Sequence, residues 1–124
     1  MMASGSRIFG IGIDVVDVGR FHESLIRTPQ LPERIFTPYE RGLSLASQAA
    51  RFAAKEALAK ALNAKAPFHW QEVEVGHEST GKPSFTFSGE MAERMAPFAV
   101  HITISHDAGI ASAMVIVEIM EDQS

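Results

Sequence analysis

The sequence predicts an α+β domain in which an antiparallel sheet packs on one long helix. Three observations indicate this class: a first segment with strand-like alternation, one long helix-forming run, and several short alternating segments after that run. This order is strand, helix, helix and then mostly strands, which favours a sheet with segregated helices. A length of 124 residues is typical of one domain. We expect that domain over residues 7–124 and interpret residues 1–6, MMASGS, as an extension or a cloning remnant.

The first strand is predicted over residues 7–14, in the stretch RIFGIGID. Apolar side chains occupy one face of this strand, and Gly10, Gly12 and Asp14 share the other face. Glycines in a strand favour the close approach of another backbone. Asp17 is a candidate N-cap for the following helix, in which apolar residues recur at helical spacing.

The remaining elements follow from spacing and from turn residues. PERIFTPYE, with prolines at 32 and 38, is predicted as a turn-rich passage. The long helix is expected from about residue 43 to 64. After it we expect, in order, a strand within 68–77 that includes VEV, a turn at STGKP (79–83), a strand at SFTF, a short helix over 90–95, and two strands, 100–105 and 110–119, joined by HDAG as a hairpin.

Composition and charge exclude several classes of protein. The formal net charge of −4 makes nucleic acid an improbable partner. The absence of cysteine excludes disulfides, zinc thiolate sites and a cysteine nucleophile. No apolar run approaches the roughly 20 residues of a membrane helix. The first ten residues lack the pattern of a secretory signal, so we expect a cytoplasmic protein without a membrane partner.

Glu56 and Lys60 stand one helical turn apart in RFAAKEALAKAL, a stretch that otherwise has the composition of a protein core. Three interpretations stay open from the helix alone. The pair can be a solvated ion pair on an exposed face, worth about 0.3–0.5 kcal/mol. It can be a buried ion pair. It can also be a site in which Glu56 binds a divalent cation and Lys60 faces a bound anion. Mg²⁺ suits the third interpretation because it takes one or two carboxylates and leaves other positions to water and phosphates.

Three further segments carry candidate binding residues, each with a plain structural alternative. Asp14 is a possible second carboxylate, or a turn residue. Gly81 and Lys82 in STGKP can receive phosphate, or form an ordinary turn without the spacing of a P-loop. Adjacent residues of an extended segment point to opposite faces, so ISHD does not form a catalytic triad, although Ser105 or His106 can bind a ligand.

Four segments together resemble one known family. GIGIDVVDVGRF (10–21), RFAAKEALAKAL (51–62), GKP and ITISHD occur in the order and spacing of the holo-[acyl-carrier-protein] synthases. These are small phosphopantetheinyl transferases of fatty-acid synthesis, and the resemblance covers nearly the whole chain after residue 6. It implies an α+β fold and a homotrimer with active sites at subunit interfaces. It also implies a reaction that moves the 4′-phosphopantetheine arm of coenzyme A onto a serine of apo-acyl carrier protein and releases adenosine 3′,5′-bisphosphate.

The resemblance also implies roles for individual residues. Asp14 and Glu56 match the two magnesium-binding acids, and Lys60 matches the lysine that contacts the pyrophosphate, so these three carry catalysis. Arg20 matches a basic helix position that faces the carrier protein. The positions near bound coenzyme A are matched by Arg51, Lys60, Gly81, Lys82, Pro83, Ser105 and His106. The serine nucleophile belongs to the partner, and the general base stays open between Glu56 and a metal-bound water.

The sequence departs from the family pattern in two places. Asn63 and Ala64 replace a glycine-containing helix end, which changes little because Asn tolerates a left-handed cap. Asp107 follows Ser105 and His106 where a small polar residue is common, and an acidic side chain near phosphate would repel it. Between residues 37 and 50 the match is weak, so no role is transferred there.

Two other function classes stay open at this point. One is a non-catalytic module that binds coenzyme A or a nucleotide, and the other is a structural domain in which Glu56 and Lys60 form a mere ion pair. The sequence leaves open whether the carrier is a free protein or a domain of a large synthase. It also leaves open the choice between Mg²⁺ and Mn²⁺ and the acceptance of acylated coenzyme A.

Overall fold

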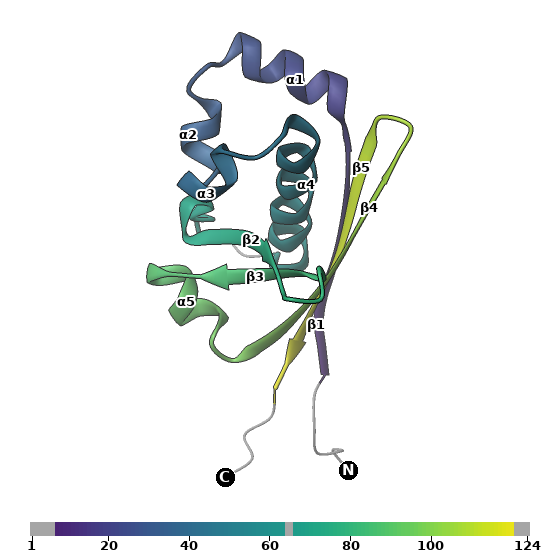
Figure 1. The fold of residues 1–124 in the computed structure, drawn as a ribbon. Helices are drawn as coiled ribbons and strands as arrows, with labels where there is room; N and C mark the ends of the chain where they lie inside the picture. The colour runs from purple at the N-terminus through teal and green to yellow at the C-terminus, as the bar shows by residue number, and fades with distance from the viewer. Residues whose placement is uncertain (1–6, 64–65, 121–124) are drawn as a thin grey trace.

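The computed structural model describes residues 7–63 and 66–120, which form two antiparallel sheets and several helices. The larger sheet has the strand order β1-β5-β4, and β2 and β3 form the smaller one (Figure 1). The strands are β1 (Arg7–Asp17), β2 (Val73–His77), β3 (Pro83–Phe87), β4 (Phe98–Asp107) and β5 (Ile110–Ile119). The helices are α1 (Val18–Arg27), α2 (Leu31–Ile35), α3 (Pro38–Arg41), α4 (Leu45–Leu62), the 3₁₀ helix η1 (Trp70–Glu72) and α5 (Gly89–Met95). The predicted α+β class with antiparallel strands is confirmed.

The backbone of α4 packs directly on β1 at two glycines. A Cβ atom on Gly10 would lie 1.8 Å from the carbonyl oxygen of Ala61, and a Cβ atom on Gly12 would lie 1.8 Å from that of Ala57. The predicted close approach of another backbone to these glycines is therefore confirmed. These two contacts also show that α4 runs antiparallel to β1. The helical turn before Ala57 therefore lies beside the residues that follow Gly12.

Substituting Gly12 with alanine is expected to destabilise the fold, because the new methyl group meets rigid backbone. We expect a loss of at least about 2 kcal/mol in the free energy of unfolding, the cost of overpacking a close-packed interface. Urea denaturation of the variant measures it. Gly76→Ala is the matched control, since a Cβ there meets no atom within 4 Å. Equal stability of the two variants would contradict the close approach.

The larger sheet has one buried face and one exposed face. In Figure 1 the helices and the smaller sheet lie on one side of β1, β5 and β4 only. On that side the sheet and α4 form the core, with Ala111, Ala113, Val115 and Val117 of β5 almost wholly buried. On the other side, the side chains of Phe9, Ile11, Ile13 and Val15 in β1 are between 47% and 61% exposed. We call this outward surface, completed by Met114 of β5, the open sheet face.

The passage predicted as turns is in part helical, which corrects the sequence-based expectation. Residues 31–35 and 38–41 form α2 and α3, each with a proline in its first turn, where the missing N–H of proline breaks no helical hydrogen bond. Thr37 caps α3 in a capping box with Glu40. The prolines therefore start short helices rather than prevent them.

The ends of the other elements agree with their expected signals. Asp17 caps α1 by accepting a hydrogen bond from the backbone N–H of Arg20 at 3.0 Å, although β1 continues to Asp17 itself. Asn63 ends α4 with a left-handed backbone (φ 45°), and Ala64 lies outside the described residues. Within the described part of the chain, every helix is too short or too polar to span a membrane.

Candidate active site

Asp14, Glu56 and Lys60 come together where β1 passes α4. Asp14 follows Gly12 on the inward face of β1, and the antiparallel course of α4 brings Glu56 to the same level. Both carboxylates line a pocket of about 350 Å³, which Arg20, Phe21 and other residues of α1, β1 and α4 complete. We call it the carboxylate pocket. The fold therefore brings Asp14 and Glu56 to one pocket, as the sequence-based prediction of a shared site requires.

Lys60 forms its ion pair with Asp14 on the neighbouring strand, and not with Glu56 on its own helix. Its Nζ lies 3.0 Å from Asp14 Oδ1 and donates a second hydrogen bond, also of 3.0 Å, to the carbonyl of Ile13. The lysine side chain is 52% exposed and that of Asp14 only 17%. The half-exposed ammonium group thus lies beside Asp14, next to the pocket.

The chemistry of the two carboxylates fits a divalent cation. Burial raises the pKa of Glu56, the charge of Asp14 raises it further, and Lys60 opposes both effects. Two carboxylates that repel each other in one pocket are an arrangement that a cation relieves. In residues 7–63 and 66–120, no group of three or more potential ligands gathers, and Mg²⁺ needs only one or two protein carboxylates when substrate phosphates supply other ligands. Asp14 and Glu56 would hold it.

The raised pKa of Glu56 predicts a pH-dependent stability in the metal-free protein. A raised folded-state pKa contributes stability that is complete below the unfolded-state value and is lost as the pH rises through the folded-state value. We therefore expect Glu56→Gln to be more stable than the unmodified protein at neutral pH in EDTA. The difference should vanish below the ordinary glutamate pKa of about 4.3. Thermal melts across pH measure it, and a difference independent of pH would contradict this origin.

A second pocket collects most of the residues expected near coenzyme A. Arg51, Gly81, Pro83 and His106 line a space of about 250 Å³ together with Val75, Gly76, His77 and neighbouring residues. We call it the hairpin pocket, because the turn between β2 and β3 forms its rim. Arg51 is held there by a 2.8 Å hydrogen bond from its Nε to the carbonyl of Val75. Gly81 has a left-handed backbone (φ 89°), which explains a glycine in this turn.

Three of the expected coenzyme A residues lie outside the hairpin pocket, and the first of them, Lys60, is paired with Asp14. Lys82 lines an adjacent, larger space of about 460 Å³ between β3, α5 and β4, which shares Pro83 with the hairpin pocket. Strand alternation places Ser105 on the open sheet face, opposite to His106. The same alternation turns Asp107 away from the hairpin pocket, so the repulsion of phosphate expected there does not arise within this pocket.

The carboxylate pocket and the hairpin pocket lie on different sides of α4. Arg51 is separated from Glu56 by about 140° and from Lys60 by about 180° around the helix axis. The two pockets have no lining residue in common. Within one chain, α4 therefore stands between the carboxylates and the residues of the hairpin pocket.

Arg20 lies on the first turn of α1 and lines the carboxylate pocket. Its side chain is exposed. A partner that docks on α1 would therefore reach the carboxylates directly, as the expected role of Arg20 requires.

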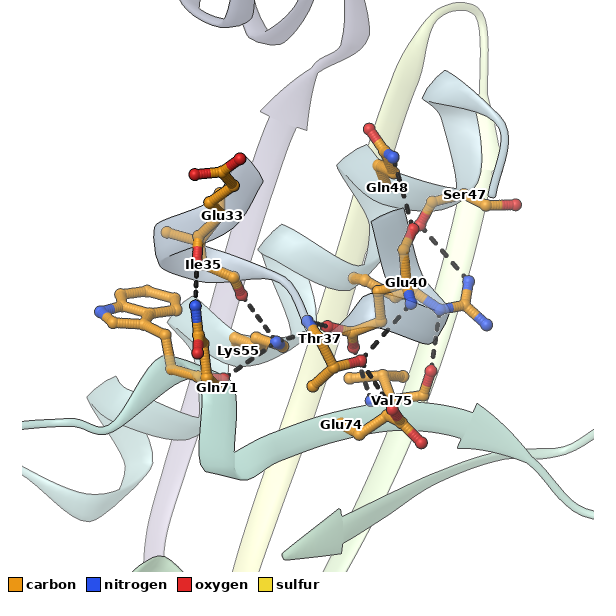
Figure 2. Close-up of polar contacts among 12 residues, drawn as sticks. Glu33, Ile35, Thr37, Glu40, Ser47, Gln48, Lys55, Gln71, Glu74 and Val75 are labelled. Atoms are coloured by element: carbon orange, nitrogen blue, oxygen red, sulfur yellow. Dashed lines mark hydrogen bonds and ion pairs between the residues drawn. The ribbon is translucent and has the colours of Figure 1, made fainter. Parts of the chain in front are cut away.

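Sequence reasoning missed a buried ion pair between Lys55 and Glu40. Their side chains are both 0% exposed, and Lys55 Nζ lies 2.6 Å from Glu40 Oε1 (Figure 2). Burial lowers the pKa of Lys55, while the hydrogen bond and charge of Glu40 oppose that effect. A signal for Glu40 was present, because Thr37 and Glu40 have the spacing of a capping box. Its contact with Lys55 spans 15 residues, and no local pattern indicates it.

The chain is similar to known proteins over most of its length. A family model described as the 4′-phosphopantetheinyl transferase superfamily matches residues 10–113. The chain is 51% identical over 114 residues to a holo-[acyl-carrier-protein] synthase of Clavibacter michiganensis subsp. michiganensis, covering 90% of this chain and 96% of that protein.

Solved structures of similar fold include complexes with ligands. A holo-(acyl-carrier-protein) synthase of Bacillus anthracis in complex with CoA (3′,5′-ADP) has a TM-score of 0.74 and 34% identity, covering 90% of this chain and 97% of that chain. A holo-[acyl-carrier-protein] synthase of Helicobacter pylori in complex with coenzyme A has a TM-score of 0.76 and 32% identity, covering 86% and 98%.

Proposed function

The chain belongs to the 4′-phosphopantetheinyl transferase superfamily, and we propose that it transfers the 4′-phosphopantetheine arm of coenzyme A to a serine of an apo-acyl carrier protein. The reaction depends on Mg²⁺ and releases adenosine 3′,5′-bisphosphate. The observation that carries this proposal is the carboxylate pocket, where Asp14 and Glu56 face one space beside the ammonium group of Lys60. The cytoplasmic location expected from the sequence stays a prediction.

The residues of the carboxylate pocket suit phosphoryl transfer, which needs positioning and charge neutralisation more than covalent catalysis. The carrier serine attacks the phosphorus that bears pantetheine, and the bond to the nucleotide phosphate breaks. A magnesium ion on Asp14 and Glu56 would neutralise the pyrophosphate and stabilise the leaving group. Lys60 adds a fixed positive charge there, and Glu56 is a candidate acceptor for the serine proton.

We expect Lys60→Ala to slow transfer through lost transition-state stabilisation, by about 2 to 4 kcal/mol as for other preorganised charges. Steady-state kinetics with saturating Mg²⁺ measure the effect. Mg²⁺ affinity should not fall, because Lys60 competes with the metal for Asp14. Lys60→Arg keeps the cation and is the matched control. Weaker Mg²⁺ binding in Lys60→Ala would contradict the assigned role.

The open sheet face supports a homotrimer with composite active sites. Five large apolar side chains are exposed there on adjacent strands, a patch typical of an interface. A cyclic trimer buries this face on every chain. Because α4 separates the two pockets in one chain, coenzyme A in the hairpin pocket of one subunit would meet the carboxylate pocket of the next. Ser105, on the open sheet face, would lie at that interface.

Arg20 gives the proposed enzyme a basic position beside the carboxylate pocket. The chain itself has a net charge of −4, so an acidic carrier protein needs such a local basic feature in order to dock. Docking on α1 would present the carrier serine to the metal-binding carboxylates.

Intact-mass spectrometry tests the proposed function directly. An apo-acyl carrier protein is incubated with this protein, coenzyme A and Mg²⁺, with EDTA as the control. We expect a mass increase of one phosphopantetheine group only when the metal is present. No increase with several apo-carriers, from protein confirmed to be folded, would favour the non-catalytic coenzyme A-binding module.

A further inference from the structure

We propose that the buried Glu40–Lys55 pair is a positioning element that fixes β2 against α4 and thereby shapes the hairpin pocket for coenzyme A. The inference rests on the proposed function only in naming coenzyme A as the ligand of that pocket. It assigns Glu40 and Lys55 no contact with substrate, and their effect passes through Val75 and Arg51.

Lys55 has all the donors of its ammonium group engaged in the protein interior. Nζ lies 2.6 Å from Glu40 Oε1, and it donates to the carbonyls of Ile35 at 2.7 Å and Trp70 at 3.1 Å. An ammonium group has three donors, so this set is complete. The three partners belong to α3, to the end of α2 and to η1, and Lys55 therefore ties these elements to α4 (Figure 2).

Glu40 extends the connection to β2. Its Oε1 also accepts from the backbone N–H of Thr37 at 2.9 Å, and its Oε2 accepts from the backbone N–H of Val75 at 2.7 Å. Figure 2 shows Glu40 between Lys55 and Val75, with a dashed contact on each side. One carboxylate thus joins α3, α4 and the middle of β2.

Both backbone groups of Val75 are held by side chains, one from α3 and one from α4. Its N–H donates to Glu40, and its carbonyl accepts from Arg51 Nε at 2.8 Å. Arg51 and Lys55 are one turn apart on the same side of α4. Arg51, Val75 and the next two residues of β2 all line the hairpin pocket. A shift of Val75 would therefore move Arg51 and the strand relative to each other and change the pocket.

Stability alone does not account for an ion pair at this place. Well-packed apolar residues of similar volume often match or exceed the stability of a buried ion pair. An apolar residue at position 40, however, offers no acceptor for the N–H of Val75. What the carboxylate supplies is a fixed position for β2, and the rim of the hairpin pocket depends on that strand.

The test compares Glu40→Leu and the uncharged double variant Glu40→Leu/Lys55→Met with the unmodified protein, because leucine offers no acceptor for the N–H of Val75. The double variant leaves no unpaired buried charge, which favours folding. Calorimetric titration gives the Kd for coenzyme A in EDTA, and transfer assays give KM and kcat. We expect both Kd and KM for coenzyme A to rise about 10-fold in each variant, the effect of a lost buried hydrogen bond, with kcat within about threefold. Faster amide exchange at Val75 should accompany the change.

Val117→Ala is the matched destabilised control, because Val117 is fully buried in β5 and lines neither pocket. A wild-type Kd and KM in the double variant would overturn the inference, and so would an equal rise in Val117→Ala. If the unmodified protein binds coenzyme A without transferring it, the proposed reaction fails while the Kd comparison still decides the positioning role. No binding by the unmodified protein, in EDTA or with Mg²⁺, would overturn both proposals.

Discussion

Asp14→Asn and Glu56→Gln are each expected to lower Mg²⁺-dependent transfer by about 1,000-fold or more while the protein stays folded. This factor corresponds to the several kcal/mol of charge stabilisation that a bound metal supplies. Both side chains line the carboxylate pocket, and each amide keeps the shape of the carboxylate but lacks its charge. Transfer kinetics over a range of Mg²⁺ concentrations, with calorimetric titration of Mg²⁺, measure the two effects together.

The stability of Glu56→Gln separates lost chemistry from lost folding. Because ionised Glu56 destabilises the metal-free protein, the variant should melt at or above the temperature of the unmodified protein at neutral pH. Loss of activity in a protein that is at least as stable then has a chemical cause. Full activity in either carboxamide variant would remove the metal assignment and leave the pocket without a catalytic role.

The parts of the site that depend on residues close together in the sequence were predictable, and the parts that depend on contacts between distant residues were not. The glycines at positions 10 and 12 and the following Asp14 were visible as one strand face, so the close approach of another backbone was predicted correctly, but not that this backbone is α4. The partner of Lys60 was harder to predict. A helix pattern offers Lys60 only one acidic partner, Glu56, which is one turn away. The observed ion pair joins Lys60 to Asp14, 46 positions away in the sequence, and no local pattern indicates it.

The unpredicted parts of the fold arise from long-range contacts. α2 and α3 are too short for a periodic signal, and Lys55 of α4 holds both of them through Ile35 and Glu40. The placement of Ser105 away from His106 follows from strand alternation, which the sequence did indicate. That Arg51 and Glu56 face different sides of α4 was likewise implicit in their spacing. The consequence of this spacing, that α4 separates the carboxylate pocket from the hairpin pocket, becomes visible only in the structure.

Mixing two inactive variants is expected to restore transfer, because each active site in the proposed trimer takes its pockets from two chains. Asp14→Asn damages the carboxylate pocket, and Arg51→Ala damages the hairpin pocket. In a trimer assembled at random from equal amounts of both variants, about a quarter of the interfaces join an intact carboxylate pocket to an intact hairpin pocket. Co-expressed and purified mixed trimers should therefore recover about a quarter of the unmodified activity, although each variant alone is nearly inactive.

A site contained in one chain gives the opposite result, since every chain in the mixture then carries a defect and no activity returns. The open sheet face supplies the control. Ile11→Glu places a charge at a position that is 61% exposed in the single chain but buried in the proposed trimer. Introduced into both variants, it should prevent assembly, which light scattering detects, and abolish the recovery. Recovery that persists in separated chains would show that it does not depend on an interface at the open sheet face, and the proposed composite site at that face would be wrong.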